Sequence, residues 1–167
     1  MNKRLFHAVT SLFCLLAIDA CAQAQPNVVV NGRSSAAEMN QTQKLMFEGA
    51  KYSMARQFKE ADAVYSQIIA SDGGNTEAYL QRAVVRRELG DESGKVSDAR
   101  NAVALASASL QANPRDFNLY YQRSLALRLL KQFDGARRDL NAAMQLGGSV
   151  TWQNDLQAID LEQKMAQ

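Results

Sequence analysis

The side chains best suited to covalent or metal chemistry lie near the N-terminal end of this sequence. The 167 residues include two cysteines, Cys14 and Cys21, and one histidine, His7. Thiolates and imidazoles serve as nucleophiles, general bases and zinc ligands. If the chain is cleaved after Ala24, the mature protein contains neither residue type. We therefore expect no disulfide, no thiol or histidine catalysis and no Cys/His metal site.

Residues 1–24 have the three parts of a secretory signal peptide. Asn2-Lys3-Arg4 is a short positive segment, residues 5–18 are an apolar run, and Ala22-Gln23-Ala24 fits the small-residue rule for cleavage. The apolar run is shorter than the roughly 20 residues that a membrane-spanning helix needs. We expect export, with cleavage after Ala24.

A second interpretation of this end stays open. Ile18-Asp19-Ala20-Cys21 resembles a bacterial lipobox, in which the cysteine is lipidated and becomes the new N-terminus. The aliphatic residue and the alanine fit that motif, whereas Asp19 departs from it. Lipidation at Cys21 predicts a membrane-anchored protein instead of a free one.

Three carboxylates near loops, Asp72, Asp91 and Glu92, are the remaining candidates for catalysis. Paired carboxylates perform acid–base chemistry when one of them is desolvated. These three lie in predicted turns, where an aspartate caps a helix and stays ionised. The sequence also shows no phosphate-binding glycine loop and no metal-ligand spacing. We expect no enzyme, no cofactor and no metal site, with a carboxylate-based enzyme as the least favoured alternative.

The charge balance argues against nucleic acid as a partner. Nineteen basic and seventeen acidic residues leave a formal charge of +2, too little for a long array of phosphate contacts. Hydrophobic residues make up 47% of the chain, which is typical of a globular protein.

The elements that follow are predicted from hydrophobic spacing. Residues 25–41 contain proline, glycine, asparagine and serine without a period, and we expect a flexible linker. From Thr42 onward, apolar and small residues recur at helical spacing in two runs, which the short joint Arg56-Gln57 separates. So short a joint predicts an antiparallel pair of helices.

This helix pair recurs along the chain. When the sequence is aligned with itself so that Phe58 meets Phe133, Ala61 meets Ala136, and a middle copy begins near Thr76. The first copy runs from Thr42 to Thr76, and the middle copy runs from Thr76 to Phe117. The middle copy is longer by about seven residues, which equal about two helical turns and fall within residues 92–110. Either Ala99 or Ala102 is predicted to occupy the helix-crossing position of the middle copy.

The chain resembles the tetratricopeptide repeat family over residues 42–148. The resemblance rests on the period of about 34 residues and on small and aromatic residues at matching positions of the copies: Gly49, Tyr52, Ala61, Tyr65, Tyr79, Ala83, Tyr120, Phe133, Ala136 and Ala143. It implies an all-α, right-handed α-solenoid of about three helix hairpins (42–75, 76–116 and 117–148). Residues 149–167 are then a capping helix, in which Trp152 contacts the core.

In the family that the chain resembles, the first helix of each hairpin lines a concave groove that binds peptides or partner helices. By register, the resemblance implies the following groove residues: Gln43, Met46, Ser53, Glu77, Leu80, Gln81, Val84, Arg87, Asn118, Tyr121, Gln122, Leu125 and Arg128. These residues suit a peptide with apolar anchors and an acidic group near Arg87 or Arg128. Arg82 and Arg123 occupy equivalent first-helix positions, and we expect them to form local pairs.

Some members of that family bind chaperone tails through lysine and asparagine at set groove positions. Residues including Met46, Gln81 and Gln122 stand at those positions here, so we do not expect that activity. The sequence predicts an exported, non-catalytic adaptor or scaffold, periplasmic in a Gram-negative bacterium, that binds a protein or peptide. The alternatives are a membrane-anchored lipoprotein with the same repeats, which serves envelope assembly, or a secreted protein. Self-association stays open.

Overall fold

Helices follow one another throughout the part of the chain that the structure describes, residues 40–166. In the computed structural model, this part forms seven α-helices and one 3-10 helix: α2 (Gln41–Met54), α3 (Phe58–Ser71), α4 (Thr76–Leu89), α5 (Glu92–Ala112), α6 (Phe117–Leu129), α7 (Phe133–Gln145), η1 (Val150–Trp152) and α8 (Gln153–Met165). None of the described helices is both long and apolar enough to span a bilayer. The expected signal peptide, Cys21 and nearly all of the expected linker lie outside the described residues.

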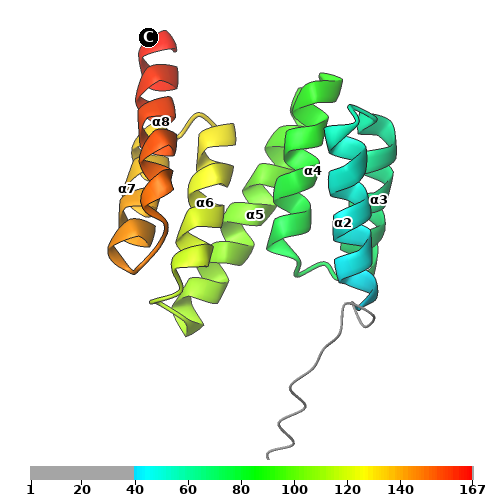
Figure 1. The fold of residues 1–167 in the computed structure, drawn as a ribbon, viewed down its shortest axis with the longest axis horizontal. Coiled ribbons are helices and arrows are strands. Elements are labelled where there is room, and N and C mark those ends of the chain that lie inside the picture. Colours follow the sequence, from blue (N-terminus) through cyan, green and yellow to red (C-terminus); the bar gives the residue numbers. More distant parts are fainter. Residues whose placement is uncertain (1–39, 167) are drawn as a thin grey trace, which may run out of the picture. The chain divides into compact units, whose positions relative to one another are not determined.

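The helices pair into three antiparallel hairpins, α2–α3, α4–α5 and α6–α7, which stack side by side (Figure 1). The first helices, α2, α4 and α6, form one row and the second helices form the other. Helix α8 follows the last hairpin. The predicted all-α solenoid of three hairpins with a capping helix is confirmed.

The three hairpin turns have the same backbone conformation and the same backbone hydrogen bond. Arg56, Gly90 and Lys131, at φ 59°, 77° and 58°, each occupy the left-handed region just after a first helix. In each turn, the next N–H donates to the carbonyl five residues earlier, at 2.9 Å. This bond is the Schellman pattern that ends a helix and reverses the chain. Only at Gly90 does the sequence supply the residue that adopts this conformation without strain.

Small residues let the two helices of a hairpin approach closely. Ala61 and Ala136, each the fourth residue of a second helix, have no exposed surface. Gly49 packs on the buried ring of Tyr65, and a Cβ added there would lie 2.7 Å from Cε1 of that ring. This packing positions α2 against α3.

The middle hairpin departs from the alanine pattern. The fourth residue of α5 is Lys95, which is 5% exposed, so neither Ala99 nor Ala102 fills the position of Ala61 and that prediction was wrong. The aliphatic stem of a lysine can be buried while its amine reaches a polar edge. The Lys95 amine does so and pairs with Glu92.

The extension of the middle repeat lengthens α5. This helix has 21 residues against 14 in α3. Its buried residues Lys95, Ala99 and Ala102 have the same spacing as the three buried residues of α3. Each of them follows its counterpart in α3 by the same number of positions. The extra two turns therefore come after Ala102. They place the third hairpin further along α5 than a regular repeat would.

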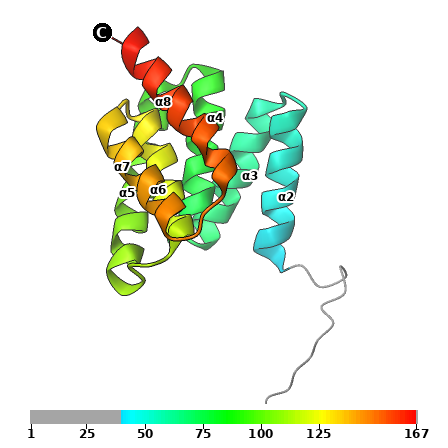
Figure 2. The same cartoon turned by 60° about the vertical axis from the view of Figure 1, so that its left-hand side comes forward.

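Helix α8 closes the C-terminal end of the array and crosses α6 and α7 obliquely (Figure 2). Ile159, only 1% exposed, packs with Leu127, Ala136 and Leu140. Trp152 stacks on Tyr121 with ring centroids 4.1 Å apart. The prediction that Trp152 contacts the core is confirmed.

Candidate functional site

A groove of about 630 Å³ opens on the side of the first helices, between α4, α6 and α8. Its walls come from several helices and from the turn after α6: Leu80, Gln81, Val84, Arg87, Lys95, Leu125, Arg128, Leu129, Lys131, Phe133, Glu162, Met165 and Ala166.

The floor of the groove is apolar. Leu80 and Val84 stand one turn apart on α4, and Leu125 and Leu129 stand one turn apart on α6. Leu80 is 4% exposed and belongs to a core cluster on which Leu125 and Leu129 pack. The floor is therefore the open edge of the hydrophobic core between the two hairpins, and side chains beneath it hold it in place.

The walls carry more positive than negative charge. Four basic side chains line the groove, Arg87, Lys95, Arg128 and Lys131, against one acidic side chain, Glu162. Arg87, Lys95 and Arg128 each pair with a glutamate, Glu88, Glu92 and Glu162 respectively. An anionic group in the groove would therefore meet Lys131 and the exposed Arg87 first, above a low-dielectric floor that strengthens such interactions.

The strongest polar contact of the groove joins α6 to α8. Arg128 donates from Nε to Oε2 of Glu162 at 2.8 Å and from Nη2 to Oε1 at 2.7 Å. This bidentate bond lowers the pKa of Glu162 and raises the pKa of Arg128. By contrast, Arg87 pairs only with the adjacent Glu88, at 3.0 Å, and its side chain is 53% exposed.

Six of the thirteen groove residues that the sequence analysis named line this groove, and the structure brings them together. These are Leu80, Gln81, Val84, Arg87, Leu125 and Arg128. The other seven, Gln43, Met46, Ser53, Glu77, Asn118, Tyr121 and Gln122, are not among its lining residues.

Contacts within the fold engage several of those seven. The Gln43 side chain accepts a bond from the Asn40 backbone N–H and completes the capping box of α2. Ser53 donates to the Gly49 carbonyl at 3.0 Å. Met46 packs on the core of the first hairpin.

Helix α8 and the 3-10 helix before it cover part of the third hairpin, including two of the expected groove residues. Trp152 lies on the ring of Tyr121 with the two planes 7° apart, so that face of the tyrosine is not free. Arg128, one of the two arginines near which an acidic ligand group was expected, pairs with Glu162.

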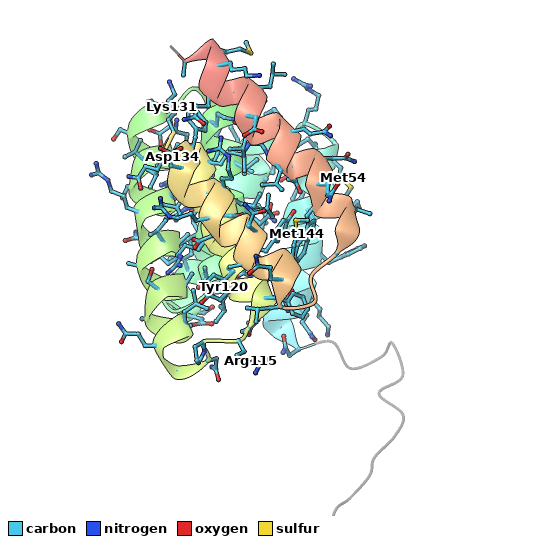
Figure 3. The ribbon with its side chains drawn as sticks, turned by 90° about the vertical axis from the view of Figure 1, so that its left-hand side faces the viewer. Met54, Arg115, Tyr120, Lys131, Asp134 and Met144 are labelled. Atoms are coloured by element: carbon cyan, nitrogen blue, oxygen red, sulfur yellow. The ribbon has the colours of Figure 1, made fainter. Side chains whose placement is uncertain are left out.

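The sequence analysis missed two exposed apolar residues on α2. Phe47 and Met54 are 68% and 84% exposed. When the repeats are aligned, Phe47 corresponds to Gln81 of the second copy and Met54 corresponds to Leu129 of the third copy, and both of these counterparts line the groove. This alignment of the repeats could have identified Phe47 and Met54 from the sequence. In Figure 3 Met54 projects at the same edge of the molecule as α8, although α2 and α8 lie at opposite ends of the array (Figure 1).

Arg82 and Arg123 do not enter the groove and form two matching ion-pair nodes. Arg82 donates to both oxygens of Asp98, at 2.7 and 2.8 Å, and to Ser66 at 2.9 Å. Arg123 does the same with Asp139 and Ser107. Each node ties the two helices of one hairpin to the second helix of the hairpin before it, so the expected local pairing is confirmed.

The candidate catalytic carboxylates have structural roles. Asp91 accepts the N–H of Gly94 at the start of α5, and Asp72 accepts the N–H of Gly74. Within residues 40–166, no group of three or more Asp, Glu, His or Cys side chains is placed to hold a metal ion.

Comparisons with known proteins agree with this architecture. No family model matches the chain. The chain is 33% identical to Tetratricopeptide repeat protein 36 of Xenopus tropicalis over 129 residues, which cover 77% of the chain and 62% of that protein. It is 32% identical to the human protein of the same name over 111 residues, 66% of the chain and 57% of that protein. The chain thus spans about three fifths of the length of these relatives.

Solved structures share the fold. The first TPR of Spaghetti (RPAP3) bound to the HSP90 peptide SRMEEVD matches with a TM-score of 0.51 and 24% identity, over 78% of the chain and 97% of that structure. The Sgt2 TPR domain from Aspergillus fumigatus matches with a TM-score of 0.53 and 20% identity, over 81% and 87%.

Proposed function

Because the chain belongs to the tetratricopeptide repeat family, we propose that it is a non-catalytic adaptor that binds a segment of a partner protein in the groove between α4, α6 and α8. The observation that carries this proposal is the groove itself. Its volume of about 630 Å³ is typical of a specific binding site. Its apolar floor between basic walls suits a segment with both apolar and acidic side chains.

Complexes of proteins with the same fold support the proposal. The structure of the first TPR of Spaghetti (RPAP3) contains a bound HSP90 peptide. The structure of the TPR2B domain of yeast Sti1 is a complex with pHsp70. These matches are at 24% and 16% identity. The identity of the partner of this chain is therefore left to experiment.

Site-specific photo-crosslinking in an extract of the source organism tests the proposal. A photoreactive amino acid replaces Gln81 in the groove or, as the control, the exposed Asn101 on α5, which lines a separate hollow and not the groove. We expect a partner to be crosslinked from position 81 and not from position 101. Arg87→Glu is expected to abolish that crosslink, whereas Arg100→Glu, the same charge reversal at an exposed position of α5, is expected to leave it unchanged. Equal crosslinking from both positions would contradict groove binding.

Export and lipidation belong to the proposal as well and rest on residues 1–24 alone. The relatives named above are vertebrate proteins and lend no support to a periplasmic location. Mass spectrometry of the protein from its own cells distinguishes the alternatives. Cleavage after Ala24 gives a chain that begins at Gln25. The lipoprotein alternative gives a lipidated chain that begins at Cys21, and Cys21→Ser abolishes the modification.

A further inference from the structure

The last turn of α8 occupies one end of the groove. Glu162, Met165 and Ala166 are all lining residues. They belong to the last turn of α8 or follow it directly, at the end marked C in Figure 2. Glu162 places its carboxylate on Arg128, and Met165 stands three residues later on the same helix. A carboxylate and an apolar side chain at i and i+3 lie on one face of a helix. The groove thus already holds a short amphipathic helical turn that presents one carboxylate to a basic side chain.

The apolar side chains of this turn are more exposed than those in the middle of α8, and the bonds of Gln163 with Arg137 and Asp134 hold the turn to α7 outside the groove. Ile159, in the middle of the helix, is 1% exposed, whereas Met165 is 79% exposed and Leu161 is 60% exposed. The bidentate pair with Arg128 is the strongest contact that the last turn makes in the groove. Because helix ends fray readily, the turn can give way while Ile159 and Trp152 keep the remainder of α8 in place.

The basic side chains of the groove walls can bind more negative charge than Glu162 supplies. Arg87 pairs only with its exposed neighbour Glu88, and Lys131 also lines the groove. The positive charge of Arg87 is also a minor cause of the lowered pKa of Glu162, which means that Arg87 acts on a carboxylate at this place. Charge complementarity therefore favours an occupant more acidic than the last turn of α8.

We propose that the last turn of α8 is an internal pseudo-ligand, and that the partner is an acidic amphipathic helix that displaces it. This inference rests on the proposed function of the groove. The helix presents a carboxylate to Arg128 and Arg87, and it places an apolar side chain three residues later on the floor formed by Leu125 and Leu129. Docking of an amphipathic helix in an apolar groove is an established mode of recognition.

Competition by Glu162 lowers the apparent affinity for the partner, because only the fraction of molecules with a displaced turn can bind. Removal of the Glu162 charge raises that fraction. A partly exposed ion pair at the upper end of its usual range corresponds to an increase in affinity of about five-fold.

Titration of the full chain with a labelled peptide tests this inference. The probe is the α8 sequence 153–166, an acidic amphipathic helix former, and its matched control carries glutamine in place of the glutamate of position 162. Binding is followed by fluorescence anisotropy, and the Nε signal of Arg128 is followed by NMR. We expect Glu162→Gln to bind the probe about five-fold more tightly than the unaltered chain. The Arg128 signal should shift only with the acidic probe.

Asp160→Asn is the matched protein control. It makes the same charge change on the same helix, but Asp160 pairs with Arg137 on α7 and does not line the groove. We expect it to leave the affinity unchanged. Equal effects of Glu162→Gln and Asp160→Asn would overturn the inference, and so would weaker binding by Glu162→Gln with unchanged Trp152 fluorescence.

The outcomes also separate this inference from the proposed function. A partner that crosslinks from position 81 while no variant binds the acidic probe contradicts the pseudo-ligand alone. The absence of any groove crosslink contradicts the proposed function. Concentration-dependent dimerisation that Glu162→Gln enhances would identify a second copy of the chain as the occupant and would overturn the inference of a separate partner.

Discussion

Removal of the Asp98 carboxylate is expected to cause the largest loss of stability among the ion pairs of residues 40–166. Asp98 is 1% exposed and accepts three guanidinium hydrogen bonds, two from Arg82 and one from Arg86 at 2.9 Å. Asp98→Ala leaves both arginines without this partner. Charged groups that lose a buried partner keep the cost of desolvation without the compensating attraction.

The size of the effect follows from how well water reaches the two arginines. Loss of one partner of a buried ion pair costs about 3–5 kcal/mol. The side chains of Arg82 and Arg86 are 13% and 22% exposed, and Arg86 keeps Asp62 at 3.0 Å. We therefore expect the lower end, about 3 kcal/mol in the free energy of unfolding. Asp139→Ala, which releases only Arg123, is expected to cost about 2 kcal/mol.

Urea unfolding followed by far-UV circular dichroism measures these differences. Asp160→Ala, which breaks an exposed pair on α8, is the control and should change the stability least. The expected order of destabilisation is Asp98, then Asp139, then Asp160. A loss below about 1 kcal/mol for Asp98→Ala, or a larger loss for Asp160→Ala than for Asp98→Ala, would refute this account of the nodes.

Three further perturbations test other parts of the structure. Gly90→Ala places a Cβ in the left-handed region and is expected to cost about 1 kcal/mol in urea unfolding, whereas Gly73→Ala, with no positive φ and its nearest contact at 3.9 Å, should cost less. Trp152→Ala removes the ring stacked on α6 and is expected to cost about 2 kcal/mol, and a thermal midpoint equal to that of the unaltered chain would contradict the stacking. Arg128 depresses the pKa of Glu162. The Glu162–Arg128 ion pair therefore stabilises the fold fully at pH values above the usual glutamate pKa of 4.5, and this stabilisation is lost as the pH falls through the depressed pKa of the folded state. Glu162→Gln should remove that part of the acid dependence, which unfolding at pH 7 and at pH 3 measures.

The fold could be predicted from the sequence because the repeat imposes the same local choices several times. Alanines such as Ala61 and Ala136 stand at the same place in separate copies, and the short joints leave no geometry except an antiparallel hairpin. The exception was Lys95. A search for a small residue passes over a lysine whose stem is buried and whose amine pairs with Glu92.

The residues of the candidate site could be predicted from the sequence only where their position on a first helix is enough to make them face the groove. Val84 and Leu125 face the groove because of their register on α4 and α6. Tyr121 and Arg128 have the same kind of register, but α8 contacts them, and the angle at which α8 docks depends on packing that no local pattern encodes. The sequence does contain the ion-pair nodes, as two Ser–Arg–Asp triplets whose members stand 16 positions apart in both copies.

The extension of α5 shows a rule about which changes of length this array accepts. Seven residues at about 100° each turn a helix through about 700°, only about 20° short of two full revolutions. The side chains that follow the extension, such as Ser107, therefore keep their azimuth and still meet Arg123. An extension of five residues would turn them through about 500° and point Ser107 about 140° away. We therefore expect such a protein to accept insertions in a second helix only when they add close to a whole number of helical turns.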